Sequence, residues 1–314
     1  MSTVSDTTHG DAATAAASPV TSPDDGLSPA ALAEKYGLSV SGARPGLAEY
    51  VRQLWGRRHF IRAYASARVT AQYTNARLGQ LWQVMTPLLN AAVYFLIFGV
   101  LLGSKRGIEN YVAYLIIGIF IFTFTQSSVL AGVKAISGNL GLIRALHFPR
   151  ASLPVAFTLM QLQQLLISMA VMLVIVLFTG EVPAWSWLLI VPALLLQSVF
   201  NVGLALGMAR LGSKMTDLTQ LMPFILRTWL YASGVFYSIR AVLEKHDLPW
   251  IVHLLLELNP AAVYIDLVRF ALIDSFGRNE LPPHVWAVAV GWALVAGIGG
   301  FLFFWKAEES YGRG

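Results

Sequence analysis

Six apolar stretches recur along this chain of 314 residues. Each is about 20 residues long, the length that a helix needs to cross the hydrocarbon core of a bilayer. Charged residues make up only 12% of the chain, against roughly 25% in soluble domains, so there is too little polar surface to cover a soluble globule. We therefore expect an all-α integral membrane protein with six transmembrane helices. The expected spans are near residues 84–103, 111–133, 153–179, 185–210, 219–239 and 285–305.

The composition changes along the chain and predicts four regions. Residues 1–45 are rich in Ala, Ser, Thr, Pro and Asp, which predicts a disordered cytoplasmic tail. Residues 46–82 mix arginines with aromatic and aliphatic residues, typical of an amphipathic helix lying among lipid headgroups. A basic stretch that only orients the next span is the alternative. The six-span domain covers residues 83–306, and residues 307–314 form a cytoplasmic C-terminus. The residues proposed to face the headgroups or the acyl boundary are Arg52, Trp55, Arg58, Arg62 and Arg68.

The long segment between the fifth and sixth expected spans has its own pattern. WIVHLLLELNPAAVYIDLVRFALID contains two apolar pieces separated by Asn259-Pro260. Each piece is too short to cross a membrane. We expect two short re-entrant or interfacial helices on the outer side, before the last span.

Lysine and arginine are unevenly distributed about the spans. With the N-terminus in the cytoplasm, 15 of the 22 lie on the cytoplasmic side, 6 on the outer side, and Arg227 within a span. Positive charge accumulates on cytoplasmic loops, so both termini are expected in the cytoplasm. The net charge of +5 comes from residues at the ends of apolar runs, so no nucleic-acid partner is expected.

The residue patterns that nucleotide binding, metal binding and catalysis require are missing from this sequence. A phosphate-binding loop needs Gly, four residues and then Gly-Lys-Ser/Thr, but the nearest approach, Gly207 to Gly212, is followed by Ser213. There is no cysteine, and the six histidines are scattered without a pair at ligand spacing. The acidic pair Glu308-Glu309 is expected to be solvated. We expect no catalytic residue, metal site or cofactor in this chain, and no enzyme activity of its own.

Arg227 is the one ionisable residue well inside an expected span. An intramembrane arginine is a candidate functional residue, because exposure to lipid is costly. Snorkelling to the interface or pairing with a carbonyl is the alternative. The Asp and Glu residues all fall in tails, loops or span ends, which disfavours an ion-coupled carrier.

Aromatic and paired small or polar residues mark further candidate faces. Rings in the first, second and fifth spans suit a sugar-conducting pore, although packing against lipid places the same residue types equally well. Gln197 and Asn201 share a helix face and either join helices or line a wet cavity. The spacing of Gly203 and Gly207 permits close helix approach. The candidate channel-lining residues are Tyr94, Phe98, Phe120, Phe124, Arg227, Trp229 and Tyr231.

The cytoplasmic segment SGNLGLIRALHFPRASLP joins the second and third spans. Its LIRALHF portion could form a turn or two of helix presented to a soluble partner, and an ordinary loop is the alternative reading. Four motifs together resemble the permease subunits of type-2 ATP-binding-cassette exporters, in particular the polysaccharide-exporting branch called Wzm. They are ARLGQLWQVMTPLL, IRALHFPRASLP, SGVFYSI and LNPAAVYIDLVRFALI, and the resemblance covers about residues 54–306.

The resemblance implies a homodimer with a pore on its axis and two copies of a separate ATPase that binds ATP and Mg. It implies that the amphipathic helix is a gate helix, and that LIRALHF is a coupling helix. The substrate would be an undecaprenyl-pyrophosphate-linked polysaccharide of the O-antigen, teichoic acid or galactan type, exported across the inner membrane of a bacterium. The Ala-rich tail points towards the mycobacterial-type galactan exporter. The residues expected to couple to the ATPase are Leu142, Arg144, His147, Phe148 and Arg150.

Three other classes of membrane protein differ from this one in the residues that they need. An ABC permease for a drug or a small lipid shares the same architecture, and the density of aromatic residues favours a glycan over it. An ion-coupled carrier would need buried acids or internal repeats. A membrane enzyme acting on lipid-linked sugars would need a carboxylate or histidine constellation at one face, such as Asp-x-Asp, and the sequence contains none.

Overall fold

The computed structural model describes residues 28–37, 45–73, 79, 81–103, 108–146, 148–245, 249–277, 281–282 and 284–311. The chain divides into two units, Met1–Ala43 and Arg44–Gly314. In the first unit the described residues form one short helix, α1 (Pro29–Lys35). The second unit holds all the elements discussed below, and its described regular structure is entirely helical.

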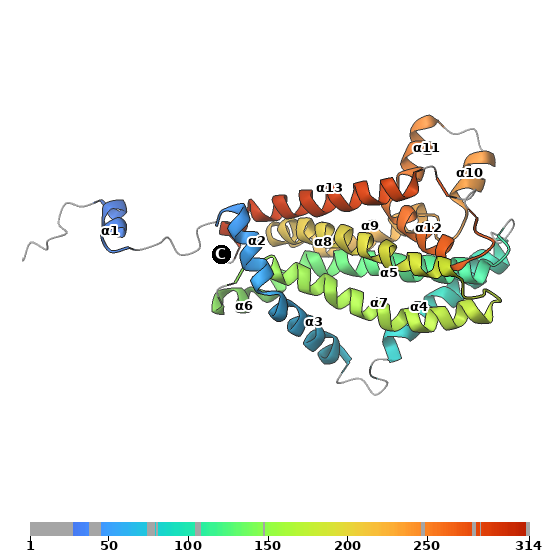
Figure 1. Ribbon diagram of the computed structural model, residues 1–314, viewed down its shortest axis with the longest axis horizontal. Coiled ribbons are helices and arrows are strands. Elements are labelled where there is room, and N and C mark those ends of the chain that lie inside the picture. The colour runs from blue at the N-terminus through green and yellow to red at the C-terminus, as the bar shows by residue number, and fades with distance from the viewer. Residues whose placement is uncertain are drawn as a thin grey trace, which may run out of the picture. The chain divides into compact units, whose positions relative to one another are not determined.

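The second unit consists of helices of very different length (Figure 1). In chain order they are α2 (Leu47–Gly56), α3 (Arg58–Tyr73), α4 (Leu81–Tyr94), the π-helix η1 (Phe95–Leu101), α5 (Tyr111–Lys134), η2 (Ser137–Asn139), α6 (Leu140–Ala145), α7 (Ser152–Phe178), η3 (Trp185–Leu189), α8 (Ile190–Lys214), α9 (Leu218–Ala232), α10 (Ile239–Lys245), α11 (Trp250–Glu257), α12 (Pro260–Leu272), α13 (Val285–Trp305) and η5 (Glu308–Ser310). In Figure 1 the helices α2 and α6 lie at one end of the bundle, and α10 and α11 at the other.

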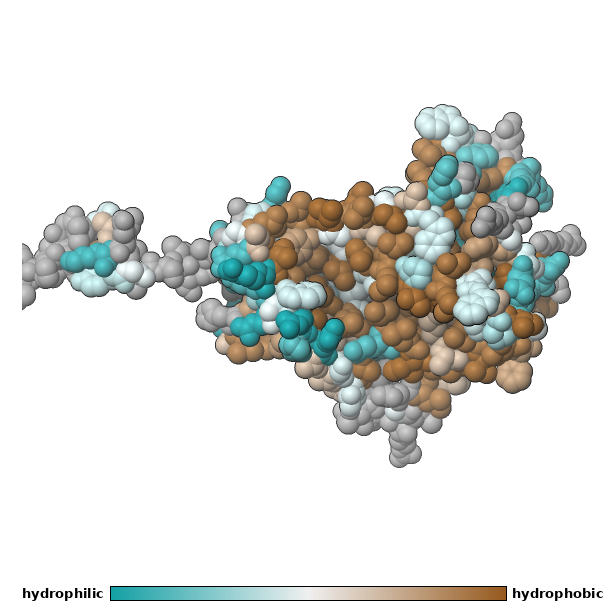
Figure 2. Space-filling model, viewed as in Figure 1, coloured by the Kyte–Doolittle hydropathy of each residue, from teal (hydrophilic) through white to brown (hydrophobic). Residues whose placement is uncertain are grey.

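Among the described residues, five helical segments are long and apolar enough to cross a membrane: Val84–Leu101, Tyr111–Lys134, Ser152–Phe178, Trp185–Lys214 and Val285–Trp305. A sixth candidate is the bent pair α11 and α12. The expected all-α membrane fold is confirmed. Helix α5 is the centre of the bundle, because 72% of its most apolar window is buried, against 17% for the first and last spans. Figure 2 shows the apolar side chains over the middle of the visible face of the bundle, as a lipid-facing surface requires.

The fifth expected span differs from its prediction. Helix α9 contains 15 residues and ends at Ala232, which corresponds to ~22 Å at 1.5 Å per residue, less than the ~30 Å of a bilayer core. Gly234 explains the early end, because its φ of +63° is the left-handed conformation with which helices commonly terminate. The chain then turns, and α10 begins at Ile239.

The break between the two apolar pieces of the segment before the last span lies at Asn259-Pro260, as the sequence predicts. Helices α11 and α12 are bent by 58° relative to each other. Asn259 caps α12 by accepting a hydrogen bond from the Ala261 N–H, and Pro260 occupies the first turn, where a missing N–H costs nothing. The Asn259 amide also donates to the Ala232 carbonyl at 3.0 Å, so the break is tied to the end of α9.

Glycines bring α8 into backbone contact with its neighbours. A Cβ added to Gly203 would lie 2.1 Å from the Ala296 carbonyl oxygen of α13, and one on Gly300 would lie 2.0 Å from the Gly203 oxygen. Gln197 joins α8 to α5, because its amide donates to the Ile121 carbonyl and to the Thr125 hydroxyl, both at 3.0 Å.

Candidate functional site

One row of side chains along α9, here called the stripe, faces away from the bundle. Its members Gln220, Arg227 and Tyr231 are exposed and follow one another at helical spacing. Phe224 lies in the same row and is 71% exposed, so this face is mixed in character. The opposite side of α9 is apolar and buried, through Met222, Leu226 and Leu230. Lipid is a costly environment for an arginine at membrane depth, so Arg227 on this face is accommodated by water, by another protein chain or by snorkelling to the interface.

Three of the predicted channel aromatics meet beside this stripe. The Phe98 ring stacks on Phe236 with centroids 4.4 Å apart, and Tyr94 contacts Phe236 at 4.8 Å. Tyr231 joins them at 5.5 Å from Phe236. Helices α4 and η1 therefore meet the turn after α9 through a cluster of aromatic rings.

Trp229 has a different environment from the other predicted channel rings. It is half-buried on the bundle side of α9, where its Nε1 donates to the Asn259 Oδ1 at 2.9 Å. The Trp229 and Phe122 rings pack edge to face, with their centroids 5.8 Å apart. The contacts of Trp229 hold the break between α11 and α12 against α9.

A cavity of about 730 Å³ lies among α3, α4, α5 and α7. Phe120 and Phe124, the remaining predicted channel rings, are 2% exposed and line it. Its wall also carries two cationic side chains, three amides and several hydroxyls. These residues are Arg68, Lys134, Gln72, Gln161, Gln164, Thr86, Thr123, Ser127 and Ser168. Positive charge, amide groups and ring faces together suit a phosphorylated, hydroxyl-rich ligand.

The predicted amphipathic region forms two helices, α2 and α3, that meet at Arg57. The basic side chains Arg52, Arg58 and Arg62 are exposed, as is Trp55 at 70%. The opposite face is buried through Tyr50, Ile61, Ala65 and Val69. A charged face opposite an apolar one is the arrangement of a helix in the headgroup region.

Arg68 differs from the other arginines of this region because it is held in place. Its guanidinium donates to the Tyr64 hydroxyl at 2.7 Å and to the Asn139 Oδ1 at 2.9 Å. The Tyr64 hydroxyl also donates to Asn139 at 3.1 Å. Asn139 immediately precedes α6, so α3 is bonded to the segment that was predicted to couple to an ATPase.

The predicted coupling segment forms the short helix α6. Leu140, Arg144 and Leu146 are exposed, and Leu142 is half-buried. Phe148, in contrast, packs against the Phe60 ring at 5.5 Å. His147 lies outside the described residues. Among the described residues that were predicted to couple to an ATPase, Arg144 is therefore exposed, whereas Leu142 and Phe148 are half-buried.

The expectation that Glu308 is solvated is wrong, since this side chain is only 6% exposed. Its carboxylate accepts from the Tyr50 hydroxyl at 2.7 Å and from the Arg150 backbone N–H at 3.0 Å. The Arg150 guanidinium donates to the Glu308 carbonyl, and the Tyr50 hydroxyl accepts from the Ala151 N–H at 3.1 Å. Arg150 thus faces the bundle, where it joins the C-terminal segment.

The environment of Glu308 makes a prediction about pH. Burial raises the pKa of its carboxyl, although hydrogen bonds from Arg150 and Tyr50 act in the opposite direction. A carboxyl with a raised pKa in the folded chain binds its proton more tightly there, so it stabilises the fold at low pH and this stability is lost as pH rises through the raised pKa.

We therefore expect the free energy of unfolding of the wild-type chain to fall as pH rises between the ordinary and the raised pKa, by at most ~1.4 kcal/mol per pH unit. Glu308→Gln should lack this fall. Thermal unfolding of the purified chain in detergent, followed at several pH values, measures it. Identical pH profiles for the two proteins would contradict the prediction.

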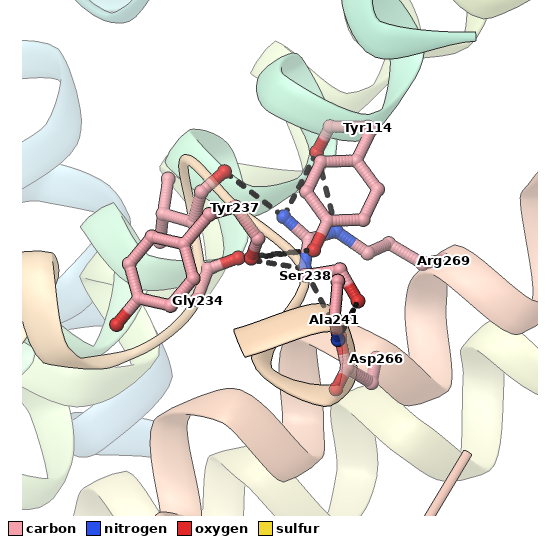
Figure 3. A network of polar contacts seen from close by, with 8 residues as sticks. Tyr114, Gly234, Tyr237, Ser238, Ala241, Asp266 and Arg269 are labelled. Carbon is pink, nitrogen blue, oxygen red and sulfur yellow. Dashed lines mark hydrogen bonds and ion pairs between the residues drawn. The ribbon is translucent and has the colours of Figure 1, made fainter. Parts of the chain in front are cut away.

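A second polar network lies at the opposite end of the bundle, around Arg269 (Figure 3). This arginine is 0% exposed and donates to the carbonyls of Tyr114, Gly234 and Val235 at 3.0–3.2 Å. It also pairs with Asp266 at 3.0 Å and covers the Tyr114 ring at 3.3 Å. Sequence reasoning counted Arg269 only as an outer-loop charge. Its position in the last turn of an apolar helix that begins at Asn259-Pro260 is the sequence signal that could have indicated its burial.

No group of three or more His, Asp or Glu side chains in the described part of the chain could hold a metal ion.

Comparison with known proteins gives the family. The chain is 27% identical over 210 residues to the O-antigen export system permease protein RfbA of Myxococcus xanthus, which covers 67% of this chain and 78% of that protein. It is also 27% identical over 182 residues to a protein of the same name from Klebsiella pneumoniae, covering 58% and 69%. Residues 60–273, more than half of the chain, match the ABC-2 type transporter family. The resemblance predicted from the four motifs is confirmed, and the chain belongs to the ABC-2 type transporter family.

Proposed function

We propose that this chain is the membrane-spanning permease subunit of an ATP-driven exporter of a lipid-linked cell-envelope polysaccharide. Family membership and the two export permeases among its relatives support the transport role. The observation that carries the proposal is the stripe of Gln220, Arg227 and Tyr231 on α9, where an arginine is exposed in one row with the apolar side chain of Phe224. Such a face is explained by a water-filled pathway.

A second copy of the chain completes this pathway in our proposal. One copy leaves α9 open on the side that exposes Arg227 and Phe224, and symmetric homodimers are the commonest solution to such an unmatched surface. The rings of Tyr94, Phe98 and Tyr231 would line the pathway. Aromatic rings stack on the C–H faces of sugars without holding their hydroxyls, which suits a polymer that must slide.

The cavity among α3, α4, α5 and α7 is the proposed site for the lipid-linked head group. Arg68 and Lys134 would attract a pyrophosphate, and Gln161 and Gln164 offer amides for sugar hydroxyls. The expected orientation places this cavity in the cytoplasmic half of the membrane, with both termini in the cytoplasm of a bacterium. An undecaprenyl pyrophosphate carrier fits this chemistry, and the Ala-rich tail supports a galactan as the polymer.

The motor would be a separate ATPase, present as two copies, which binds ATP and Mg. The exposed surface of α6, formed by Leu140, Arg144 and Leu146, is the proposed docking site. Apolar side chains flanking one cation provide burial and charge pairing at such an interface.

The test replaces Arg227 in a host whose own copy of the gene is deleted. We expect Arg227→Gln to reduce surface polysaccharide about tenfold or more and to accumulate the lipid-linked polymer inside, because the loss of a charged hydrogen bond changes an equilibrium by roughly that factor. Arg227→Lys retains the charge and should be less impaired. Arg240→Gln, at an exposed outer position, is the control. Normal export by Arg227→Gln would contradict the proposed pathway.

A further inference from the structure

The segment around α6 is hydrogen-bonded on both of its sides to the amphipathic helices. On the N-terminal side, Asn139 accepts from Tyr64 and Arg68 of α3. On the C-terminal side, the backbone N–H groups of Arg150 and Ala151 bond to Glu308 and Tyr50. Two attachments that flank one short helix restrain it more than either alone, because a single attachment leaves a rotation free.

The Glu308 attachment joins three parts of the chain that are far apart in sequence. Tyr50 belongs to α2, Arg150 precedes α7, and Glu308 follows α13. The carboxylate is the common acceptor, and the Tyr50 side chain lies in one buried cluster with Phe304 and Tyr311. The Trp305 Nε1 adds a bond to the Pro45 carbonyl at 3.1 Å. The start of α2 is thus held to the end of α13 by two bonds.

We infer that Glu308 is a positioning residue that makes α6, α2 and α3 move as one body, so that displacement of α6 reaches the cytoplasmic cavity. Arg68 carries the movement to the cavity, since it is bonded to Asn139 and also lines the cavity wall. This inference rests on the proposed docking of an ATPase at α6. It assigns to the C-terminal segment a part in transmission that neither the family nor the sequence pattern indicates.

The chemistry of the site explains why a carboxylate is needed. Both of its oxygens accept bonds from fixed donors, one from a hydroxyl and one from a backbone N–H. In Glu308→Gln the amide oxygen can still accept from the Arg150 N–H, but an uncharged NH₂ group then faces the Tyr50 hydroxyl. The bond from that hydroxyl to a charged acceptor is therefore lost while the size is unchanged. Tyr50→Phe removes the hydroxyl and keeps the ring that packs on Phe301 at 5.8 Å. Both variants therefore weaken the hydrogen bond between Tyr50 and Glu308: Glu308→Gln changes its acceptor, and Tyr50→Phe removes its donor.

The first measurement uses the complete complex with its ATPase in proteoliposomes. We expect Glu308→Gln and Tyr50→Phe to retain ATPase binding and hydrolysis but to export about tenfold less polymer per ATP, the factor that a charged hydrogen bond contributes to an equilibrium. Glu309→Gln removes the same charge one position away, at an exposed site, and should export normally. Normal coupling in both test variants would overturn the inference. A wild-type complex that binds the ATPase but exports nothing would instead count against the proposed function.

The second measurement reports motion directly and separates transmission from simple stability. The chain has no cysteine, so Trp55→Cys and Ser137→Cys, which replace exposed residues of α2 and of η2 directly before α6, accept one spin label each. Labelled chain is diluted with unlabelled chain so that a complex carries one labelled copy.

The distance between the two labels should stay constant between nucleotide states when Glu308 is present, and should change or broaden with nucleotide in Glu308→Gln. A distance that already changes in the chain with Glu308 would contradict motion as one body. If Glu308→Gln yields no folded protein, Tyr50→Phe provides the same comparison.

Discussion

Arg269→Ala should destabilise the half of the bundle around α12 by about 3–5 kcal/mol, the range for breaking a buried charge network. The substitution removes the donor to the carbonyls of Gly234 and Val235 in the turn after α9, and leaves Asp266 without this cation. Each orphaned buried group then costs its own desolvation. Because the turn holds α9 to α5 and α12, we expect lower yield and a lower Tm.

Arg269→Lys should recover little of this loss. Lysine keeps the charge, but it lacks the planar fork that reaches several acceptors and the flat face that covers the Tyr114 ring. Arg240→Ala is the matched control, since its pairing with Glu244 is on the surface and such pairs contribute about 0–1 kcal/mol. Thermal unfolding in detergent compares the three variants. Equal Tm values for Arg269→Ala and Arg240→Ala would refute the role given to the network.

Gly203→Ala should separate α8 from α13 and destabilise the fold by several kcal/mol. The new methyl carbon would lie 2.1 Å from the Ala296 carbonyl oxygen and 2.6 Å from the Gly297 nitrogen. Backbone atoms cannot rotate away as a side chain can, so the helices must move apart and lose packing along their length. Overpacking of this kind typically costs 1–3 kcal/mol, and occasionally more, and backbone contact places Gly203 at the upper end.

Gly207→Ala provides the control on the same helix, four residues away. A Cβ at Gly207 meets no atom within 4 Å, and alanine is the better helix former by about 1 kcal/mol. We expect Gly207→Ala to be neutral or stabilising while Gly203→Ala is poorly expressed. The Tm values of the two variants, measured in one detergent, test this prediction. A similar decrease in Tm in both variants would contradict the close contact between α8 and α13 at Gly203.

Signals that are local in sequence determined much of this protein. The lengths of the apolar runs predicted five of the spanning segments, because a helix satisfies its own backbone in lipid whatever surrounds it. Asn259-Pro260 marked the break between α11 and α12 through the cap and the missing N–H. The alternation of arginine with apolar residues predicted the two-sided helices α2 and α3. The end of α9 at Ala232 was also available locally, from Gly234, but the apolar residues beyond it favoured a longer span.

Contacts between distant residues were decided only by the tertiary structure. Glu308 and Glu309 look alike in sequence, yet Glu308 is buried because Tyr50, 258 residues away, brings a hydroxyl to it. Arg269 and Arg240 both count as outer charges until Tyr114, 155 residues from Arg269, supplies its carbonyl. Gly203 and Gly207 form one motif, and only the path of α13 makes the first indispensable. The local sequence determines which side chains are able to be buried and which helices are able to approach closely. Packing in three dimensions decides which of them meets a partner that makes burial or close approach favourable.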